Sequence, residues 1–508
     1  MNEGPTPSQN DRSADRGRHI VRGIGSLTAQ SALSAVLGLI LLIALVRFLS
    51  KNDYGAYSAV SVTVGIASVV TGFGLGAAVV KFLPPAGGDK VGLQWGAAKA
   101  SLYLTLVLAT AGTFVLVAVA PYLSDYFLKT PSNAWVFYLG AAILFMTTVD
   151  NPFLGALQGM RKYGSFAKVL LGSRAAAVGM AVVGVALYHS LAIALAALAV
   201  YSALVLAAIV PPVWRPLTGA DPGPYYGRVM SYALPLGVAS IVSVIASNAD
   251  IVVVGGYLNP GSLAVYYATI QVSSILSSLF VTPLVTTLFA ETSFSSEREP
   301  EVKRGTSLAL RFVSFTLLPA SLLVAAMARQ LFVLFSGGGS YTEGIPYLEL
   351  ILVFYAFAGI QNISISVLQG VGRTRQVLAV GAVTAIGEVV LSASLVPGLG
   401  LAGAAYSRVA MMVVGCIISI HYIMRYIPRP VDFGFYVRAL LASVIPATAV
   451  YVPSVLISSR VLTLVPYTLL GLGIFIVCAR GLKLVSAEDK TYLSHLLPGK
   501  LQRVLELL

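Results

Sequence analysis

Long apolar segments, separated by short polar stretches, follow one another from residue 24 to residue 484. A helix needs about 20 apolar residues to cross the hydrocarbon core of a bilayer. By that measure the chain holds fourteen candidate spans, each bounded by Gly, Pro or charge: 24–49, 55–80, 98–122, 135–158, 165–188, 190–214, 231–257, 262–290, 305–328, 345–370, 375–396, 400–424, 434–458 and 462–484. The pattern predicts an all-α polytopic membrane protein with about 14 transmembrane helices.

Composition agrees with this pattern. The chain has 508 residues, of which 57% are hydrophobic and only 10% are charged, and its mean hydropathy is +0.86. Soluble proteins carry about 25% charged residues, so a water-soluble globule is excluded. Two cysteines lie in apolar segments and four histidines are scattered without ligand spacing. We therefore expect no metal site and no cofactor.

The positive charges indicate membrane topology. Of the 33 Lys and Arg residues, 25 fall in loops on the side of the N-terminus and four in the opposite loops. Lys and Arg accumulate in cytoplasmic loops of membrane proteins. We therefore expect a multi-pass protein of the cell membrane with both termini in the cytoplasm. The net charge of +13 then reflects topology, and no nucleic-acid partner is expected.

The two halves of the chain resemble each other. Residues 48–57 align with 257–266 at an offset of 209, and Leu157-Gln158-Gly159 recurs as Leu368-Gln369-Gly370 at an offset of 211. An offset that spans six helices keeps the orientation of each helix in the membrane. The sequence therefore predicts two parallel-repeat six-helix bundles related by an axis along the membrane normal.

These observations divide the chain into five parts. Two extra C-terminal helices lie outside the repeat, and the C-terminal tail has leucines near helical spacing that suit a helix lying on the membrane. The expected parts are a basic cytoplasmic tail (1–22), an N-terminal six-helix bundle (23–215), a C-terminal six-helix bundle (229–426), two additional transmembrane helices (433–485) and a cytoplasmic amphipathic tail (486–508).

Ionisable residues inside spans are costly, at about 2.5 to 3.5 kcal/mol each on insertion scales. The arginines Arg47, Arg174, Arg311 and Arg408 are of this kind, and counting about 1.5 Å per residue places Arg174 near mid-bilayer. A guanidinium stays charged and matches phosphate oxygens, so these four are candidate substrate-binding residues, with Gln30 as a polar one. For Arg174 the alternative is a buried ion pair with Asp150. For Arg47 and Arg311 it is snorkelling to an interface.

Four acids also fall within predicted spans: Asp150, Asp250, Glu349 and Glu388. Burial raises the pKa of a carboxyl group toward values at which protons exchange. These acids are therefore candidates for coupling transport to Na+ or H+. The alternatives are a solvated rim position for Asp250 and Glu349, and structural pairing of Glu388 with Arg408. The membrane potential alone is another possible driving force.

The first span ends in Arg47-Phe48-Leu49-Ser50, followed by Asp53-Tyr54-Gly55-Ala56-Tyr57. Together with Tyr232-Ala233-Leu234-Pro235-Leu236, Asn248-Ala249-Asp250 and Gly256-Tyr257-Leu258 around the seventh span, this order resembles oligosaccharide flippases of the Wzx type. These form the polysaccharide transporter family of the multidrug/oligosaccharidyl-lipid/polysaccharide (MOP) exporter superfamily. The resemblance covers roughly residues 20–485.

The resemblance implies two six-helix bundles around a central cavity that opens alternately to each side. It also implies transport of a polyprenyl (pyro)phosphate-linked oligosaccharide to the outer leaflet, for surface polysaccharide or glycan assembly, without enzymatic activity. Expected partners are the lipid-linked oligosaccharide, membrane lipids and glycan assembly enzymes, and we expect a monomer.

Other functions stay open at this point. A multidrug or cation antiporter and a lipid II flippase belong to the same superfamily. The first span lacks the acid common in the multidrug branch, and the eighth lacks the cation that the lipid II branch carries there. A polytopic enzyme of sugar chemistry would need acids in a sizeable outer loop, where the sequence offers only Asp125 and Glu343. A nonspecific scramblase or an assembly scaffold is a further alternative.

Overall fold

The computed structural model describes residues 30–83, 91–282, 285, 299–337, 341–425, 433–456 and 463–484. Within these residues every regular element is helical, and no strand occurs. The predicted tails, 1–22 and 486–508, lie outside the described residues. The predicted all-α membrane fold is confirmed for the part of the chain described.

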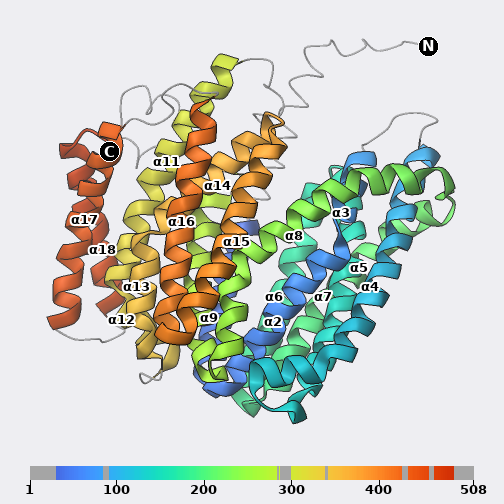
Figure 1. The fold of residues 1–508 in the computed structure, drawn as a ribbon, viewed down its shortest axis with the longest axis horizontal. Helices are drawn as coiled ribbons and strands as arrows, with labels where there is room; N and C mark the ends of the chain where they lie inside the picture. Colours follow the sequence, from blue (N-terminus) through green and yellow to red (C-terminus); the bar gives the residue numbers. More distant parts are fainter. Residues whose placement is uncertain are drawn as a thin grey trace, which may run out of the picture.

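The N-terminal bundle occupies one side of the molecule (Figure 1). Its first helix covers Gln30–Phe48. It continues with α2 (Lys51–Gly72), α3 (Leu75–Phe82), α4 (Val91–Leu128), the short η1 (Pro131–Asn133), α5 (Trp135–Gly159), α6 (Tyr163–Tyr188) and α7 (Leu191–Thr218). Helix α5 packs against α2, α4 and α7, which makes it the central helix of this bundle.

The second bundle begins after η2 (Gly223–Tyr225). It contains α8 (Tyr226–Tyr257), α9 (Pro260–Leu276) with a π-helical turn η3 (Ser277–Val281), α11 (Glu299–Ala326), α12 (Ala328–Ser336), η4 (Thr342–Gly344), α13 (Ile345–Val353), α14 (Tyr355–Gly370), α15 (Thr374–Leu399) and α16 (Leu401–Met424). Helix α8 packs along α15 and also reaches α2, α3 and α4, so it joins the two bundles. Helices α17 (Phe433–Leu456) and α18 (Leu464–Gly481) pair with each other, and α17 packs on α11 at the outer side of the second bundle (Figure 1).

Thirteen of the described helices are long and apolar enough to cross a membrane, or fourteen if α13 and α14 form one span bent by 46°. The sequence prediction of about fourteen spans is thus confirmed, and it places this bent span at 345–370. The second span is also interrupted. Helix α2 ends at Gly72, Phe73 adopts a left-handed conformation (φ 40°), and α3 begins at Leu75. A hydropathy pattern reports only the length of an apolar segment. It therefore predicts neither the bend between α13 and α14 nor the break between α2 and α3.

The aligned segments of the two halves have the same local structure. Ser50 caps α2 by accepting a hydrogen bond from the backbone N–H of Asp53, and Asn259, its partner in the alignment, caps α9 by accepting one from Ser262. Likewise, Leu157 and Leu368 each lie two residues before a helix end, and the backbone oxygen of each accepts a hydrogen bond from the backbone N–H five positions later. The sequence repeat therefore corresponds to repeated helix termini.

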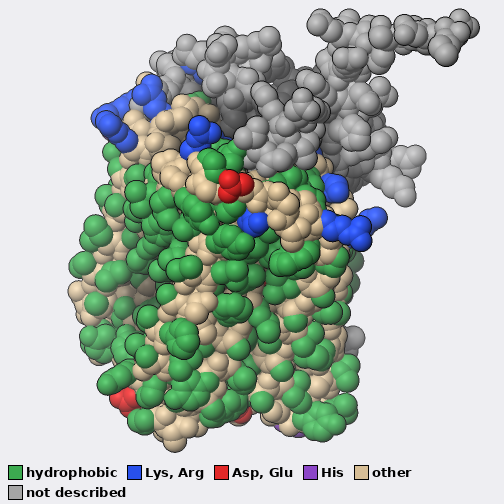
Figure 2. All heavy atoms as spheres, turned by 90° about the vertical axis from the view of Figure 1, so that its right-hand side faces the viewer, with side chains coloured by type: hydrophobic (Ala, Val, Ile, Leu, Met, Phe, Trp, Pro, Cys, Tyr) green, Lys and Arg blue, Asp and Glu red, His purple; other side chains and the backbone are tan. Residues whose placement is uncertain are grey.

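Lys and Arg separate onto two ends of the molecule. Helix ends on one side, here called the basic end, carry Lys81, Arg161, Lys162, Arg215, Arg373, Arg425 and Arg480. The opposite end carries Arg47, Lys51, Lys129 and Arg329. Figure 2 shows Lys and Arg side chains gathered at one end of the visible face, with hydrophobic side chains covering the face below them. That the basic end faces the cytoplasm stays a prediction.

The two bundles are packed tightly together at the end opposite the basic end. There α2 crosses α9 so closely that a Cβ atom on Gly55 would lie 2.0 Å from the backbone oxygen of Pro260. Beside this crossing, Lys51 Nζ donates to Glu343 Oε1 at 2.6 Å and lies over the ring of Tyr341. Tyr54 and Tyr341 are buried in the core cluster that both bundles share. We call this contact region, formed by residues 47–57, 257–267, 335–337 and 341–347, the seal.

Candidate functional site

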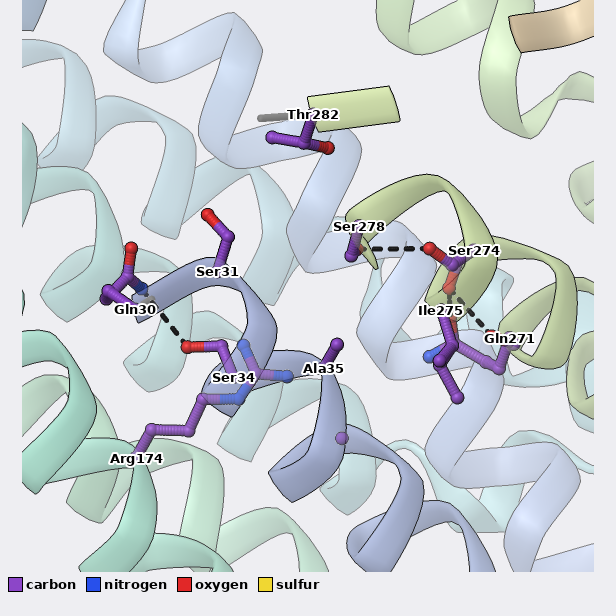
Figure 3. A pocket seen from close by; sticks show the side chains of 11 residues that line it. Gln30, Ser31, Ser34, Ala35, Arg174, Gln271, Ser274, Ile275, Ser278 and Thr282 are labelled. Carbon is purple, nitrogen blue, oxygen red and sulfur yellow. Dashed lines mark hydrogen bonds between the residues drawn. The ribbon is translucent and has the colours of Figure 1, made fainter. Parts of the chain in front are cut away.

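A polar pocket of about 220 Å³ lies between the two bundles. One wall comes from the first helix and α6, the other from α9 and η3 (Figure 3). Its lining consists of Gln30, Ser31, Ser34, Ala35, Gly38, Arg174, Gln271, Ser274, Ile275, Ser278 and Thr282. The first helix enters the pocket near its start and reaches the seal at its end, so the pocket lies toward the basic end and the seal separates it from the opposite end.

Among the described residues that line the pocket, Arg174 is the only charged one. Its side chain extends from α6 toward the first helix and lies beside Ser34 (Figure 3). Within the described residues Arg174 makes no hydrogen bond and no ion pair, and Asp150 does not pair with it. A guanidinium with unused donors, partly buried between two helical bundles, is a ready anion-binding group.

The first helix contributes side chains of mixed character. Gln30 Nε2 donates to Ser34 Oγ at 3.1 Å, one helical turn along. This bond leaves the carbonyl oxygen and the second amide hydrogen of Gln30 without a partner in the described part of the chain. The structure thus brings together Arg174 and Gln30, two of the residues that the sequence singled out for substrate binding.

The opposite wall is a row of hydroxyl groups. Ser274 Oγ donates to the backbone oxygen of Gln271 at 2.8 Å, and Ser278 Oγ donates to that of Ser274 at 3.0 Å. Thr282 Oγ1 donates to Ser277 O at 3.3 Å across the π-helical turn. Each hydroxyl therefore uses its hydrogen within the helix and leaves oxygen lone pairs for a ligand.

The other three predicted arginines lie outside the pocket. Arg47 is exposed at the seal, beside Gly337. Arg311 on α11 lies over the ring of Phe435 on α17, with 4.8 Å between the guanidinium carbon and the ring centroid. Neither of these two arginines therefore lines the central pocket.

Arg408 forms a buried ion pair with Asp250 inside the second bundle. Its Nε donates to Asp250 Oδ2 at 2.6 Å, its Nη2 donates to Oδ1 at 2.7 Å, and Nη2 also donates to the backbone oxygen of Ser247 at 2.9 Å. Tyr266 donates its hydroxyl hydrogen to the same carboxylate. The pair joins α8 to α16, and Asp250 is fully buried rather than solvated at a rim.

The remaining acids differ in their surroundings. Glu388 is 3% exposed and lies near Asp250 and Arg408, yet its Oε1 has no hydrogen-bond partner among the described residues. Asp150 is buried on α5 beside Ser202 of α7, and its Oδ1 is likewise without a partner there. Glu349 is half-buried on α13 near Arg329. None of these acids lines the pocket.

The sequence analysis did not select the small polar residues of the pocket. Ser31, Ser34, Ser274, Ser278 and Thr282 are common residues in membrane helices, where they often hydrogen-bond within or between helices. The available signal was their spacing, because positions 30, 31, 34 and 38 and positions 271, 274, 278 and 282 each follow one helical face. Within the described residues no group of three or more His, Cys, Asp or Glu side chains is arranged to hold a metal ion.

Comparison with solved structures finds a similar fold in several membrane transporters. The lipid II flippase MurJ in an inward closed conformation superposes with a TM-score of 0.72 at 12% identity, covering 89% of this chain and 98% of that one. An inward-facing multidrug resistance MATE family transporter of the MOP superfamily gives 0.62 at 15% identity, with 78% and 94% covered. A MOP superfamily transporter from Pyrococcus furiosus gives 0.57 at 14% identity, with 80% and 96% covered.

Sequence comparison identifies a family directly. No curated protein matches the sequence. A family profile described as polysaccharide biosynthesis protein matches residues 44–346, which is more than half of the chain and includes the whole of α2 through α9. The protein is therefore a multi-pass membrane protein that belongs to the polysaccharide biosynthesis protein family.

Proposed function

We propose that this protein is a flippase that moves a polyprenyl (pyro)phosphate-linked oligosaccharide from the cytoplasmic to the outer leaflet of the cell membrane, for surface polysaccharide or glycan assembly. The observation that carries the proposal is Arg174, which has no ion-pair partner among the described residues and lies in a hydroxyl-lined pocket between two bundles. The family match and the fold of the MOP transporters support the same role.

The pocket chemistry suits an anionic sugar lipid. Arg174 would neutralise a phosphate, and Gln30 with the serines would hydrogen-bond to the head group. No carboxylate occurs among the described residues of the lining. A multidrug or cation antiporter would need negative groups to bind its substrate, so this alternative has less support. The proposed mechanism is secondary transport, with no chemical step.

The arrangement of seal and pocket supports alternating access from the cytoplasm. With both termini and the basic end in the cytoplasm, the pocket lies on the side where the lipid-linked substrate is made, and the seal blocks the other side. The membrane potential contributes about 2.3 kcal/mol per charge per 100 mV. A pyrophosphate with roughly two negative charges would therefore gain several kcal/mol on moving outward.

We also propose ion coupling through the buried acids. Glu388 is faced by Asp250 of α8, Arg408 of α16 and Tyr266 of α9. Two carboxylates share one guanidinium, so this cluster is neutral only when it also holds a proton or a monovalent cation. Asp150 and Glu349 are the other candidates. Dependence of transport on pH or Na+ that disappears in Glu388→Gln, Asp150→Asn, Asp250→Asn or Glu349→Gln would support coupling, and indifference of the wild type to both ions would leave the membrane potential as the driving force.

The proposed partners follow from this role. They are the lipid-linked oligosaccharide, the surrounding membrane lipids and the enzymes that assemble the glycan on either leaflet. A monomer suffices, because both walls of the pocket belong to one chain.

The test is a gene deletion followed by measurement of the lipid-linked glycan on each leaflet. We expect the glycan to accumulate on the cytoplasmic leaflet and wild-type protein to restore its outward movement. Arg174→Gln should fail to restore it, whereas Arg215→Gln, which removes an exposed arginine in the last turn of α7 outside the pocket and the seal, should succeed. Immunoblotting of membranes verifies equal protein levels. Unchanged sidedness in the deletion strain would refute the flippase.

A further inference from the structure

The two walls of the pocket offer opposite hydrogen-bonding groups. On the N-terminal side, Arg174 presents guanidinium donors and Gln30 retains a free amide hydrogen. On the C-terminal side, Ser274, Ser278 and Thr282 have directed their hydroxyl hydrogens to backbone oxygens of α9 and η3. A backbone oxygen only accepts, so these three hydroxyls must act as donors within the helix. Toward the pocket they are therefore hydrogen-bond acceptors.

Gln271 has both kinds of group. Its Nε2 donates one hydrogen to the hydroxyl of Tyr267 at 3.1 Å, away from the pocket lining, and keeps a second amide hydrogen. Its side-chain oxygen lies 3.3 Å from Ser274 Oγ. Ile275 adds an apolar surface to the same wall. The wall formed by α9 thus offers oxygen lone pairs beside a hydrocarbon patch.

Phosphate and sugar have opposite requirements. A phosphate at neutral pH mainly accepts hydrogen bonds, so it fits the donor wall. A sugar ring carries several O–H donors and an apolar C–H face, so it fits lone pairs beside Ile275. From this polarity we infer that the two bundles bind different parts of one glycosyl phosphate head group: the N-terminal wall binds the phosphate and the α9 wall binds the adjoining sugar. This inference rests on the flippase function proposed above.

The size of the pocket is consistent with such a split. A volume of about 220 Å³ is below the roughly 300–1,000 Å³ of pockets for drug-sized ligands. It suits a phosphate with the sugar next to it between the two walls. The carrier lipid without a sugar would contact only one bundle. A glycosylated carrier would contact both and hold them together.

The test compares three lipids with purified full-length protein in detergent: a short-chain polyprenyl diphosphate, the same lipid carrying one hexose, and its analogue with fluorine in place of hexose hydroxyls. Fluorine nearly preserves size but cannot donate a hydrogen bond. Thermal unfolding reports binding, because a ligand that binds the native state raises its melting temperature. We expect the hexose lipid to bind about 5- to 30-fold more tightly than the other two, as for one or two hydrogen bonds.

Variants separate the two walls. Ser274→Ala combined with Ser278→Ala should remove the advantage of the hexose lipid and leave binding of the bare diphosphate unchanged. Arg174→Gln should weaken binding of all three lipids. Ser394→Ala is the matched control, because Ser394 on α15, like Ser278, donates its hydroxyl hydrogen to the carbonyl four residues earlier and lies outside the pocket. These serine changes leave no buried donor without a partner, so the variants should fold.

Flipping of the same lipids in vesicles, measured in parallel, separates the two proposals. If wild-type protein flips the hexose lipid but binds bare, hexose and fluorinated lipids equally, the division between the walls is wrong and the flippase function stands. If the serine variant loses binding of the bare lipid and of the hexose lipid equally, the division between the walls is likewise wrong. If wild-type protein flips none of these lipids, the proposed function itself fails.

Discussion

The guanidinium of Arg174 lies against the bare backbone of Gly38, and a Cβ atom at position 38 would be 3.3 Å from Arg174 Nη2. The first helix thus leaves space for an arginine that reaches across from α6. Because no ion pair or hydrogen bond within the described residues holds this guanidinium, the shape of the first helix sets its position.

A side chain at position 38 should therefore weaken anion binding. Gly38→Ala requires a shift of a few tenths of an ångström, so we expect less than about a 5-fold loss in binding of polyprenyl diphosphate. Gly38→Val fills more of the space, and the loss should approach the roughly 10- to 100-fold expected when a charged hydrogen bond is removed. Thermal stabilisation by the lipid measures both.

Gly179→Ala on α6 is the control, because a Cβ atom there meets nothing within 4 Å. Replacing glycine in a helix raises helix propensity at either position. A gain in stability without ligand is therefore expected at both positions, and a loss of lipid binding only at position 38. Full lipid affinity in Gly38→Val would mean that Gly38 does not set the position of the guanidinium.

Removing only Arg408 from its buried pair with Asp250 should destabilise the protein more than neutralising both residues. Arg408→Gln leaves a buried carboxylate without its counter-charge, and the free energy of unfolding should fall by about 3–5 kcal/mol. Adding Asp250→Asn removes that charge and should restore most of the loss. Thermal unfolding of purified protein in detergent provides the measurement.

Ser247→Ala is the control here, since Arg408 binds only the backbone oxygen of that residue and stability should not change. If the double variant is as unstable as Arg408→Gln alone, the unpaired charge is not the cause.

The crossing of α2 and α9 should tolerate no side chain. Gly55→Ala places Cβ 2.0 Å from Pro260 O, which forces the helices apart and should cost about 1–3 kcal/mol of stability. Gly65→Ala on the same helix meets nothing within 4 Å and should be neutral or stabilising. Thermal unfolding compares the two, and equal stability would show that the crossing adapts easily.

The seal should open during transport. Lys51 and Glu343 are 34% and 56% exposed, and such a surface pair contributes only about 0–1 kcal/mol, so it does not prevent opening. In a protein with Cys416 and Cys478 replaced by Ala, a reducible thiol crosslink between Lys51→Cys and Glu343→Cys should abolish flipping, and reduction should restore it. The single-cysteine variants serve as controls. Flipping by fully crosslinked protein would show that these residues stay together throughout the cycle.

The membrane spans were predictable because each depends on a local run of apolar residues. The break at Phe354 and the π-helical turn at Ser277–Val281 were not, because apolar length carries no information about backbone geometry. Among the candidate residues, Arg174 stood out by its depth in a span. That it meets Gln30 depends on how the first helix packs against α6, which no local pattern shows.

The pairing of Arg408 illustrates the same limit. From the sequence, Glu388 was the partner considered for this arginine. In the structure Asp250, 158 residues away along the chain, forms the bidentate contact. Such pairing is decided by which helix faces meet after folding. Likewise, the pocket serines became recognisable only when α9 was seen opposite the first helix (Figure 3).

The tight crossing at Gly55 and Pro260 also determines how the protein is exposed to inhibitors. In the proposed orientation, with the basic end in the cytoplasm, a blocking compound dissolved in the external medium meets packed backbone at this crossing and has no direct route to Arg174. Compounds that enter the cell, or that partition into the bilayer and arrive beside the first helix, reach the pocket in this conformation. Drug discovery aimed at this protein therefore depends on membrane permeability as much as on affinity.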